Sequence, residues 1–458
     1  MSASRRTAAI LILLFLVFQV RSPASELAAD LGGSPVPVGA GPRALGMGGA
    51  FTAVADDATA NTWNPGGMIQ LERPEAAFSM AYRVDRTRSP DRGDSNTSTA
   101  NLDHVSLVLP FFVGGAQQTV GLAWQRQLDF TRSIAFEQHE VTSGSNSSLM
   151  VDGSQRAEQE GGFASVSASY AIEPLPGLGL GVTAHGWNDD WTMNSHYKRR
   201  DQSDTITSLA ITFPPITLIQ RDEIDNHRTT TVEKGYSFTL GAWWQATPSL
   251  TVAATVKPEY HLHLLSEVES HQRSTDVSSS TVIADSTTRF VYPSEFIYPT
   301  SATVAAAWRA YDVHTIAVDV GWTRWRDYRI RQGGVTSSPV NILIDPKRFP
   351  DTYTVRLGYE HLSILPRAVL VERLGAFYEG LPAATRIADS SQVGQAEPTV
   401  DDFYGATAGL SLCLRSVLYD LSAQVRTGND VGAGQYGPLT QSVDILTVTA
   451  RAGVTCQF

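Results

Sequence analysis

"LTVTARAGVTCQF" (Leu446–Phe458), the last thirteen residues of the chain, alternates strictly between two kinds of side chain. Every second residue, beginning with Leu446, is apolar: Leu446, Val448, Ala450, Ala452, Val454, Cys456 and Phe458. The residues between them are mostly polar: Thr447, Thr449, Arg451, Gly453, Thr455 and Gln457. Because successive side chains of a strand point to opposite faces, this period of two predicts a β-strand with one apolar face.

The same alternation recurs along the chain from Glu75 onward. With the last segment it gives fourteen candidate strands, at 75–84, 103–111, 119–127, 162–172, 177–187, 236–247, 250–260, 301–310, 314–325, 352–362, 373–379, 404–414, 418–426 and 446–458. Several reach the roughly 9 to 11 residues that a tilted strand needs to cross a bilayer. Alternation alone does not separate a membrane barrel from a soluble sandwich with one wet face.

The connections between these segments separate the two architectures. Short connections such as 247–249 and 415–416 alternate with long ones rich in Ser, Thr, Asp, Gly and Gln, near 87–100, 132–159, 194–233, 265–298, 330–350, 380–401 and 428–440. Outer-membrane barrels have tight periplasmic turns on one rim and long extracellular loops on the other. We therefore expect an all-β, 14-stranded antiparallel transmembrane β-barrel in the bacterial outer membrane.

Aromatic residues near strand ends fit the two interfacial girdles of such a barrel: Tyr82, Trp124, Trp187, Trp191, Trp244, Trp308, Trp322, Tyr353, Tyr359 and Tyr378. Aromatic enrichment in strands of any kind is the alternative explanation. The terminal Phe458 resembles the C-terminal aromatic signal of bacterial outer-membrane barrels. Cys413 and Cys456, the two cysteines, fall on opposite faces of their strands, so we expect no disulfide.

The N-terminus carries a charged pair, Arg5 and Arg6, then an apolar run and Ser22-Pro23-Ala24. This is the pattern of a secretory signal peptide, predicted over residues 1–24. The net charge of −11 argues against nucleic-acid binding, because no basic tract is present to neutralise phosphates. No nucleophilic Gly-x-Ser-x-Gly elbow appears, and His261 and His263 lack further ligands at metal spacing, so neither an enzyme, a metal nor a cofactor is expected.

Between signal and barrel lies "GPRALGMGGAFTAVADDATANTWNPGG" (Gly41–Gly67), which has no helical or strand period. It is nevertheless too apolar for a solvated linker. We predict that residues 25–74 form a compact plug inside the lumen of a barrel formed by residues 75–458. Glycines there allow close packing and positive φ, and Asp56-Asp57 is expected to cap backbone groups rather than to bind a metal.

Four stretches resemble the FadL family of outer-membrane transporters of hydrophobic compounds: Arg43–Met68, Tyr298–Tyr328, Asp351–Leu362 and Asp402–Leu412. The first is similar to the family's hatch, with Asn64-Pro65 matching its Asn-Pro motif and Gly46 and Gly48 in its glycine-rich part. The resemblance implies a plugged barrel that takes up long-chain fatty acids or hydrocarbons passively. Gly-rich openings of this kind also resemble PorV-type barrels, so a structural or secretion-associated barrel that binds a protein partner remains the alternative.

Candidate ligand-binding residues come from three regions. In the plug, Met47, Phe51, Trp63 and Met68 are candidates to line a hydrophobic pocket, with packing against the wall as the alternative. On a lumenal strand face, Arg356 is a candidate for a carboxylate head group, although Arg309, Arg373 and Arg451 with Asp319, Glu360 and Glu379 more often form internal ion pairs.

The long region 194–233 contains the third set, an apolar stretch with Leu209, Phe213 and Leu218, for which we predict a first capture groove. Lys198, Arg199 and Arg200 nearby are candidates for lipopolysaccharide phosphates. The family resemblance also implies lateral release near a kinked third strand, where Gly121 is the candidate kink. The pattern leaves the oligomeric state open.

Overall fold

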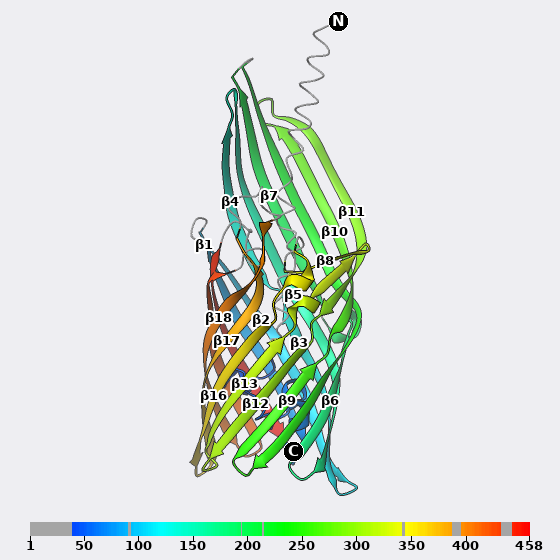
Figure 1. Ribbon diagram of the computed structural model, residues 1–458, viewed down its shortest axis with the longest axis vertical. Helices are drawn as coiled ribbons and strands as arrows, with labels where there is room; N and C mark the ends of the chain where they lie inside the picture. Colours follow the sequence, from blue (N-terminus) through cyan, green and yellow to red (C-terminus); the bar gives the residue numbers. More distant parts are fainter. Residues whose placement is uncertain are drawn as a thin grey trace.

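The computed structural model describes residues 39–89, 93–193, 195–212, 215–340, 344–386, 395–431 and 442–458. Their strands form one antiparallel sheet of twenty strands, and fourteen of them close into a barrel (Figure 1). Going around the wall these are β1 (Glu75–Ser89), β2 (Gly93–Val113), β3 (Ala116–Asp129), β5 (Ser147–Leu175), β6 (Leu178–Trp187), β8 (Ile216–Thr247), β9 (Leu250–Lys257), β12 (Ser301–Ala310), β13 (His314–Thr323), β16 (Thr352–Leu365), β17 (Ala368–Ala384), β18 (Pro398–Leu414), β19 (Val417–Val431) and β20 (Val443–Gln457).

The last strand closes the barrel by pairing with the first. β20 is antiparallel to β1 from Glu75↔Gln457 to Arg88↔Asp444, so no barrel edge is left open. Each of the fourteen segments predicted from the alternation overlaps one of these strands, with 250–260 and 314–325 extending past the ends of β9 and β13, and the predicted fold class is confirmed. The faces are as expected: along β20, Leu446 and Val448 are exposed outward, whereas Thr447 and Thr449 are buried inward.

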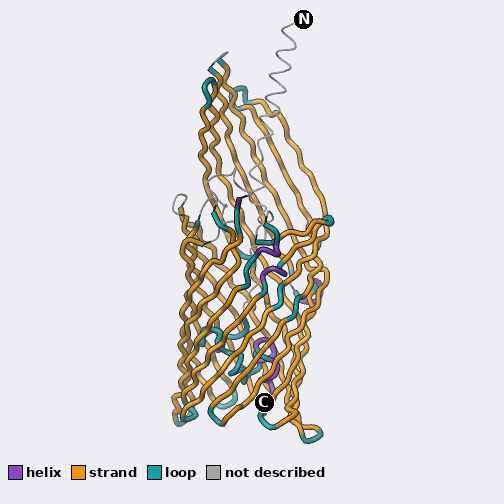
Figure 2. Tube along the Cα trace, in the orientation of Figure 1, coloured by secondary structure: helices purple, strands orange, loops and turns teal. Residues whose placement is uncertain are grey.

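Six further strands extend this sheet on the extracellular side: β4 (Arg132–Ser143), β7 (His196–Ile211), β10 (Tyr260–Asp276), β11 (Thr281–Tyr298), β14 (Arg329–Gln332) and β15 (Val335–Ser337). β4, β7, β10 and β11 combine with the outer halves of β5 and β8 into one wall in the order β4-β5-β7-β8-β10-β11. We call this wall the extracellular sheet; it rises well beyond the rest of the barrel (Figures 1 and 2).

The extracellular sheet corrects one prediction. The regions 132–159, 194–233 and 265–298 were expected to be loops, but most of their residues are strands. Both faces of this sheet carry polar side chains, among them Ser203 and Thr205 on the buried face of β7, so the apolar alternation that marks the membrane strands is absent there. Three short helices of the described ranges lie in the remaining extracellular connections: α4 (Asp189–Thr192) and the 3-10 helices η3 (Trp325–Asp327) and η4 (Pro346–Arg348).

No helix in the described ranges is long and apolar enough to span a membrane. Both cysteines, Cys413 and Cys456, are free. Most of the predicted girdle aromatics that were expected to face outward do so, among them Tyr82, Trp244 and Trp308. Trp187 does not: it is 2% exposed and packs inside the lumen, because its strand ends where the interior widens into an aromatic cluster.

Candidate functional site

Residues 39–74 lie inside the barrel and contain only short helices: α2 (Pro42–Gly46), α3 (Ala60–Trp63) and the 3-10 helix η2 (Pro65–Gln70). We call this segment the plug (Figure 2). With so little regular structure, its backbone polar groups need partners from elsewhere. The wall supplies them: Thr119 donates to Met68 O at 3.1 Å, Thr183 to Asn61 O at 2.7 Å, and Trp243 Nε1 to Ala53 O at 2.9 Å.

The Asn64-Pro65 motif fixes the turn of the plug and fastens it to β8. Asn64 Nδ2 donates to Thr52 O at 2.9 Å and to Ala242 O at 3.1 Å, and its Oδ1 accepts from Gly66 N at 3.0 Å. Pro65 opens η2, where a missing N–H has no cost. One side chain therefore closes the turn, joins it to the rest of the plug and attaches it to the barrel.

This turn fits only because the wall has glycines opposite it. A Cβ added to Gly241 would lie 2.1 Å from Asn64 Oδ1, and one added to Gly179 would lie 2.1 Å from Gly66 O. A third glycine of the same notch, Gly181, faces Pro65 C at 2.4 Å. All three glycines are inward-facing positions of barrel strands, in β6 and β8. Because they have no side chain, the backbone of the plug can lie directly against the backbone of the wall.

A second notch receives the glycine-rich part of the plug. Gly48, with φ of 67°, adopts a conformation that disfavours other residues, and it lies against Gly375 of β17. A Cβ added to Gly375 would be 2.2 Å from Gly48 N. A Cβ added to Gly46 would be 3.1 Å from Gly409 Cα. Thr407 Oγ1 donates to Gly46 O at 2.9 Å. Gly46 and Gly48 thus seat the plug on β17 and β18.

Arg43 is the electrostatic anchor of the plug. It donates from Nε and Nη2 to the two carboxylate oxygens of Glu360 in β16, both at 2.9 Å, and Nη1 lies 2.5 Å from Asp56 Oδ1. Its guanidinium also lies 5.4 Å from the centre of the Phe51 ring. Burial lowers the pKa of Arg43, but Asp56 and Glu360 outweigh that effect and hold it above its ordinary value.

Two chambers in the described part of the lumen lie on the extracellular side of the plug. The first, of about 250 Å³, we call the arginine chamber; it is lined by Arg83, Arg126, Arg132, Arg426 and Arg451 with Asp85, Asp103, Asp129 and Glu379 among others. The second, of about 140 Å³, we call the aromatic chamber. Gly39, Trp63 and Arg356 line both chambers. Trp63, fixed by a bond from Nε1 to Ala40 O at 2.8 Å, therefore stands between them.

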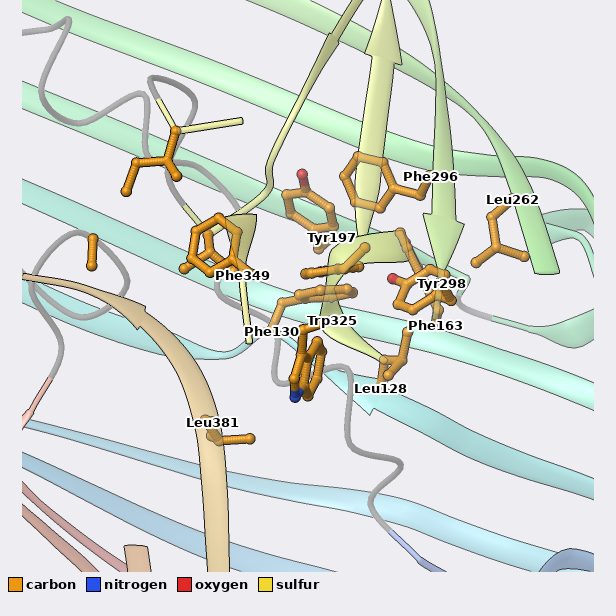
Figure 3. Packing of buried hydrophobic residues seen from close by; sticks show 14 of the residues in the cluster. Leu128, Phe130, Phe163, Tyr197, Leu262, Phe296, Tyr298, Trp325, Phe349 and Leu381 are labelled. Atoms are coloured by element: carbon orange, nitrogen blue, oxygen red, sulfur yellow. The ribbon is translucent and has the colours of Figure 1, made fainter. Parts of the chain in front are cut away.

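Stacked aromatic rings form the outer boundary of the aromatic chamber. The rings of Tyr260 and Tyr298 stack at 4.9 Å, and Trp187 stacks on Tyr260 at 5.8 Å. Trp325 lines the chamber too, and its Nε1 donates to Thr352 Oγ1 at 2.6 Å. Figure 3 shows the cluster to which these residues belong, with Phe130, Phe163, Tyr197, Phe296 and Phe349 packed around them. Packed aromatic rings thus line the extracellular side of the chamber.

Two cations face the aromatic chamber from the wall, Lys257 at the end of β9 and Arg356 in β16. Within the described ranges neither side chain has an ion pair or hydrogen bond. Asp319 is near enough to attract Arg356, but not within ion-pair distance, and its Oδ2 already accepts from Thr52 N at 3.0 Å. The other named lumenal arginines differ: Arg373 lies 2.6 Å from Glu360, and Arg451 lies 3.3 Å from Asp103.

The sequence of residues 39–379 matches the family model described as outer membrane protein transport protein (OMPP1/FadL/TodX). This match covers most of the chain, including the plug and most of the barrel. The chain belongs to the FadL family. It is accordingly a bacterial outer-membrane protein of a family of transporters of hydrophobic compounds, and the resemblance inferred from the plug motif is confirmed.

Solved structures of FadL-type proteins share the architecture at low sequence identity. A CymD monoaromatic hydrocarbon channel is 14% identical with a TM-score of 0.50, covering 92% of this chain and 98% of that one. A Pseudomonas aeruginosa FadL homologue is 11% identical (TM-score 0.50; 91% and 97% covered), and the Pseudomonas putida toluene transporter TodX is 10% identical (TM-score 0.51; 94% and 99% covered). These likenesses show the fold. No curated protein sequence matches the chain.

Within this FadL-family lumen the predicted plug residues fall into two groups. Met47, Phe51 and Met68 are fully buried between plug and wall and line neither chamber, so their positions fit the packing alternative. Met68 occupies the space that Gly121 leaves in β3, since a Cβ there would be 3.0 Å from its Cε. Trp63 and Arg356 line both chambers. Lys257 was missed, because a single lysine at a strand end carries no signal.

The expected kink at Gly121 is wrong. β3 pairs through Gly121 on both sides, with Val108 of β2 and Ser169 of β5, so the wall is continuous there. The glycine makes room for Met68 instead of bending the strand.

The predicted capture residues lie at the tip of the extracellular sheet. Leu209 and Leu218 face each other across the β7–β8 hairpin, and Phe213 lies outside the described residues. Arg199 pairs with Asp201 and Arg200 with Asp225, so the basic run is divided between ion pairs on two faces of β7. Capture of ligand by the hairpin tip and binding of lipopolysaccharide by this run both stay predictions.

Proposed function

We propose that this protein takes up, passively and without converting them, hydrophobic molecules that carry one anionic group, such as long-chain fatty acids. The observation that carries the proposal is the pair Lys257 and Arg356 in a chamber otherwise bounded by aromatic rings. A half-buried cation without an ion-pair partner in contact loses hydration that is only partly compensated. An anionic head group would offset that loss, while a plain hydrocarbon would leave it in place.

The tail of such a molecule has apolar surroundings on either side of this pair. Tyr260, Tyr298 and Trp325 lie toward the extracellular side, and Trp63 of the plug lies on the opposite side. Each CH₂ moved from water into such surroundings contributes about 0.8 kcal/mol. The chamber is small for a whole long-chain acid, so we expect binding to displace Trp63 and to join the two chambers, with Trp63 acting as the gate between them.

An exit from the arginine chamber is suggested by the strand pairing. β2 and β3 pair from Val113↔Ala116 only as far as His104↔Gln125, although β2 continues to Gly93. Beyond that point the chamber is lined by β2 residues 99 and 101–103 and, across from them, by residues 126, 129–132 and 134 of β3, β4 and the connection between them. We propose that ligand leaves between these diverging strands, because no ladder hydrogen bonds have to break there.

A partner-binding scaffold of the PorV type is the competing function. A scaffold has no use for open lumenal space, whereas two chambers lie directly above the plug here. The hairpin tip with Leu209 and Leu218, the predicted capture groove, fits either function and does not separate them.

The double substitution Lys257→Met and Arg356→Met tests the proposed head-group site. Methionine keeps an unbranched apolar stem and removes the charge. We expect the wild-type protein to bind a long-chain fatty acid about 10- to 100-fold more tightly than its methyl ester, since a charge-assisted contact contributes about 1.5–3 kcal/mol. The double variant should bind both ligands like the ester.

Titration calorimetry in detergent, with the fatty acid and its methyl ester as paired ligands, measures both affinities. The matched control is Arg324→Met, an exposed extracellular arginine whose ion-pair partner among the described residues is Asp327. An undiminished preference for the acid in the double variant would overturn the head-group site. Failure of the wild-type protein to bind either ligand would instead overturn uptake of such compounds altogether.

A further inference from the structure

The extracellular sheet ends in a long unpaired edge at β11. Residues Thr281–Pro293 pair with β10 on one side, and no described strand pairs with the other side, because β14 meets β11 only at residues 294–297. Every residue from Thr281 to Val291 is exposed. In Figure 1 this strand forms the outer margin of the raised sheet, opposite β4. The backbone N–H and C=O groups of this edge are therefore available to another strand.

Over a defined segment the edge lacks proline, glycine, lysine and bulges, and its charged side chains are Asp285 and Arg289. A register shift between Ser274 and Thr275 of β10 leaves Ile283 unpaired at one end, and Pro293 stands at the other. Between them, Ala284–Tyr292 contains no proline, glycine or lysine. Natural edges are commonly protected by such residues or by bulges. Nine consecutive residues thus form an uninterrupted edge with a limit at each end.

The sequence of this edge is complementary to itself when it is reversed. In antiparallel self-pairing centred on Thr287, Asp285 faces Arg289 of a second copy, and Arg289 faces the second copy's Asp285. The next positions pair Ser286 with Thr288 and Ala284 with Phe290. Asp285 and Arg289 lie on the same face of β11. Asp285 Oδ1 is 2.9 Å from His271 Nε2, Arg289 Nη2 is 2.9 Å from Glu269 Oε2, and both partners lie on one face of β10. A twofold axis therefore produces two favourable charge pairs.

We propose that the β11 edge is an interaction surface for β11 of a second copy of this chain. The strand direction sets the geometry of the pair. β11 runs from the hairpin tip toward the membrane, so an antiparallel partner strand belongs to a protein whose membrane lies on the opposite side. The two copies meet head to head across the gap between two apposed outer membranes. Main-chain hydrogen bonds provide the attraction, and the charge pairs fix the register.

Two single substitutions separate this contact from effects within one copy. Asp285→Arg gives an edge with arginine at both charged positions, and Arg289→Asp gives an edge with aspartate at both. Each variant should associate with itself about tenfold more weakly than wild type, because every like-charge pair occurs twice. An equimolar mixture of the two variants should associate as well as wild type, since opposite charges then face each other.

The measurement is analytical ultracentrifugation of the full-length protein in detergent, repeated as tethering of two differently labelled populations of proteoliposomes that carry the extracellular side outward. Heat-modifiable migration on gels checks that each variant barrel is folded. Self-association that is equal in all variants, or that the mixture fails to restore, would overturn the proposed pairing.

A cross-link checks the register independently. Thr287 lies on the twofold axis, so Thr287→Cys in a Cys413→Ser, Cys456→Ser background should form a disulfide with a second copy, whereas Ser278→Cys in the same background, beyond the paired segment, should form about tenfold less. Equal yields at the two positions would contradict the register.

Discussion

Replacing Arg43 by alanine is expected to unseat the plug and make the barrel conduct small ions. Arg43 joins the plug to β16 through Glu360 and neutralises Asp56 and Asp57 within the plug. Truncating one partner of a buried ion pair costs about 3–5 kcal/mol. We expect the low end of this range, because Glu360 keeps Arg373 at 2.6 Å and the loss falls mainly on Asp56 and Asp57. Each 1.4 kcal/mol is a factor of ten, so the population with a displaced plug should rise more than a hundredfold.

Single-channel recording in planar bilayers measures this opening. Arg309→Ala is the matched control, because Arg309 also approaches Asp56, at 3.6 Å, but its side chain is 48% exposed and such pairs contribute little. The control should stay closed. A closed baseline in the Arg43 variant would show that the glycine notches alone hold the plug and that the ion pairs are dispensable.

Gly241→Ala is expected to displace the Asn64-Pro65 turn while the barrel stays folded. The added methyl group would lie 2.1 Å from Asn64 Oδ1 and 2.8 Å from Pro65 Cδ, distances that require one backbone to move. Asn64 would then lose its bonds to Thr52 O and Ala242 O. Amide hydrogen exchange in residues 60–70 should become about 5- to 100-fold faster, since these bonds together contribute about 1–3 kcal/mol.

Hydrogen exchange followed by mass spectrometry gives the rate for this segment. Gly321→Ala is the comparison, because Gly321 is also in a barrel strand but its added methyl group would meet nothing closer than 3.5 Å. Unchanged exchange in both variants would mean that the wall yields to the methyl group, and the notch would then not determine how the plug is seated.

The membrane strands were predictable because lipid on one side and polar side chains on the other impose alternation, as along Leu446–Phe458. The extracellular sheet was not, because a strand such as β7 places polar side chains on both faces, Gln202 and Asp204 on one and the buried Ser203 and Thr205 on the other, and leaves no contrast to detect. The length of the polar regions was visible, but their pairing into one wall was not.

The candidate site was only partly predictable for a different reason. Gly46, Gly48, Asn64 and Pro65 stand out in the sequence, and contacts with the wall explain each of them. Their receiving glycines, such as Gly241 and Gly375, look like ordinary strand residues until the plug is placed. Lys257 and Arg356 come together only through the circumference of the barrel, which strand patterns do not specify.

The central claim is that the aromatic chamber holds a hydrophobic molecule by its anionic group. The most direct measurement is mass spectrometry of lipids that remain bound to protein extracted from native membranes without refolding, for wild type and for the Lys257→Met, Arg356→Met variant. We predict a hydrophobic acid bound stoichiometrically to wild type and lost from the variant. A neutral hydrocarbon bound equally to both proteins would contradict the claim.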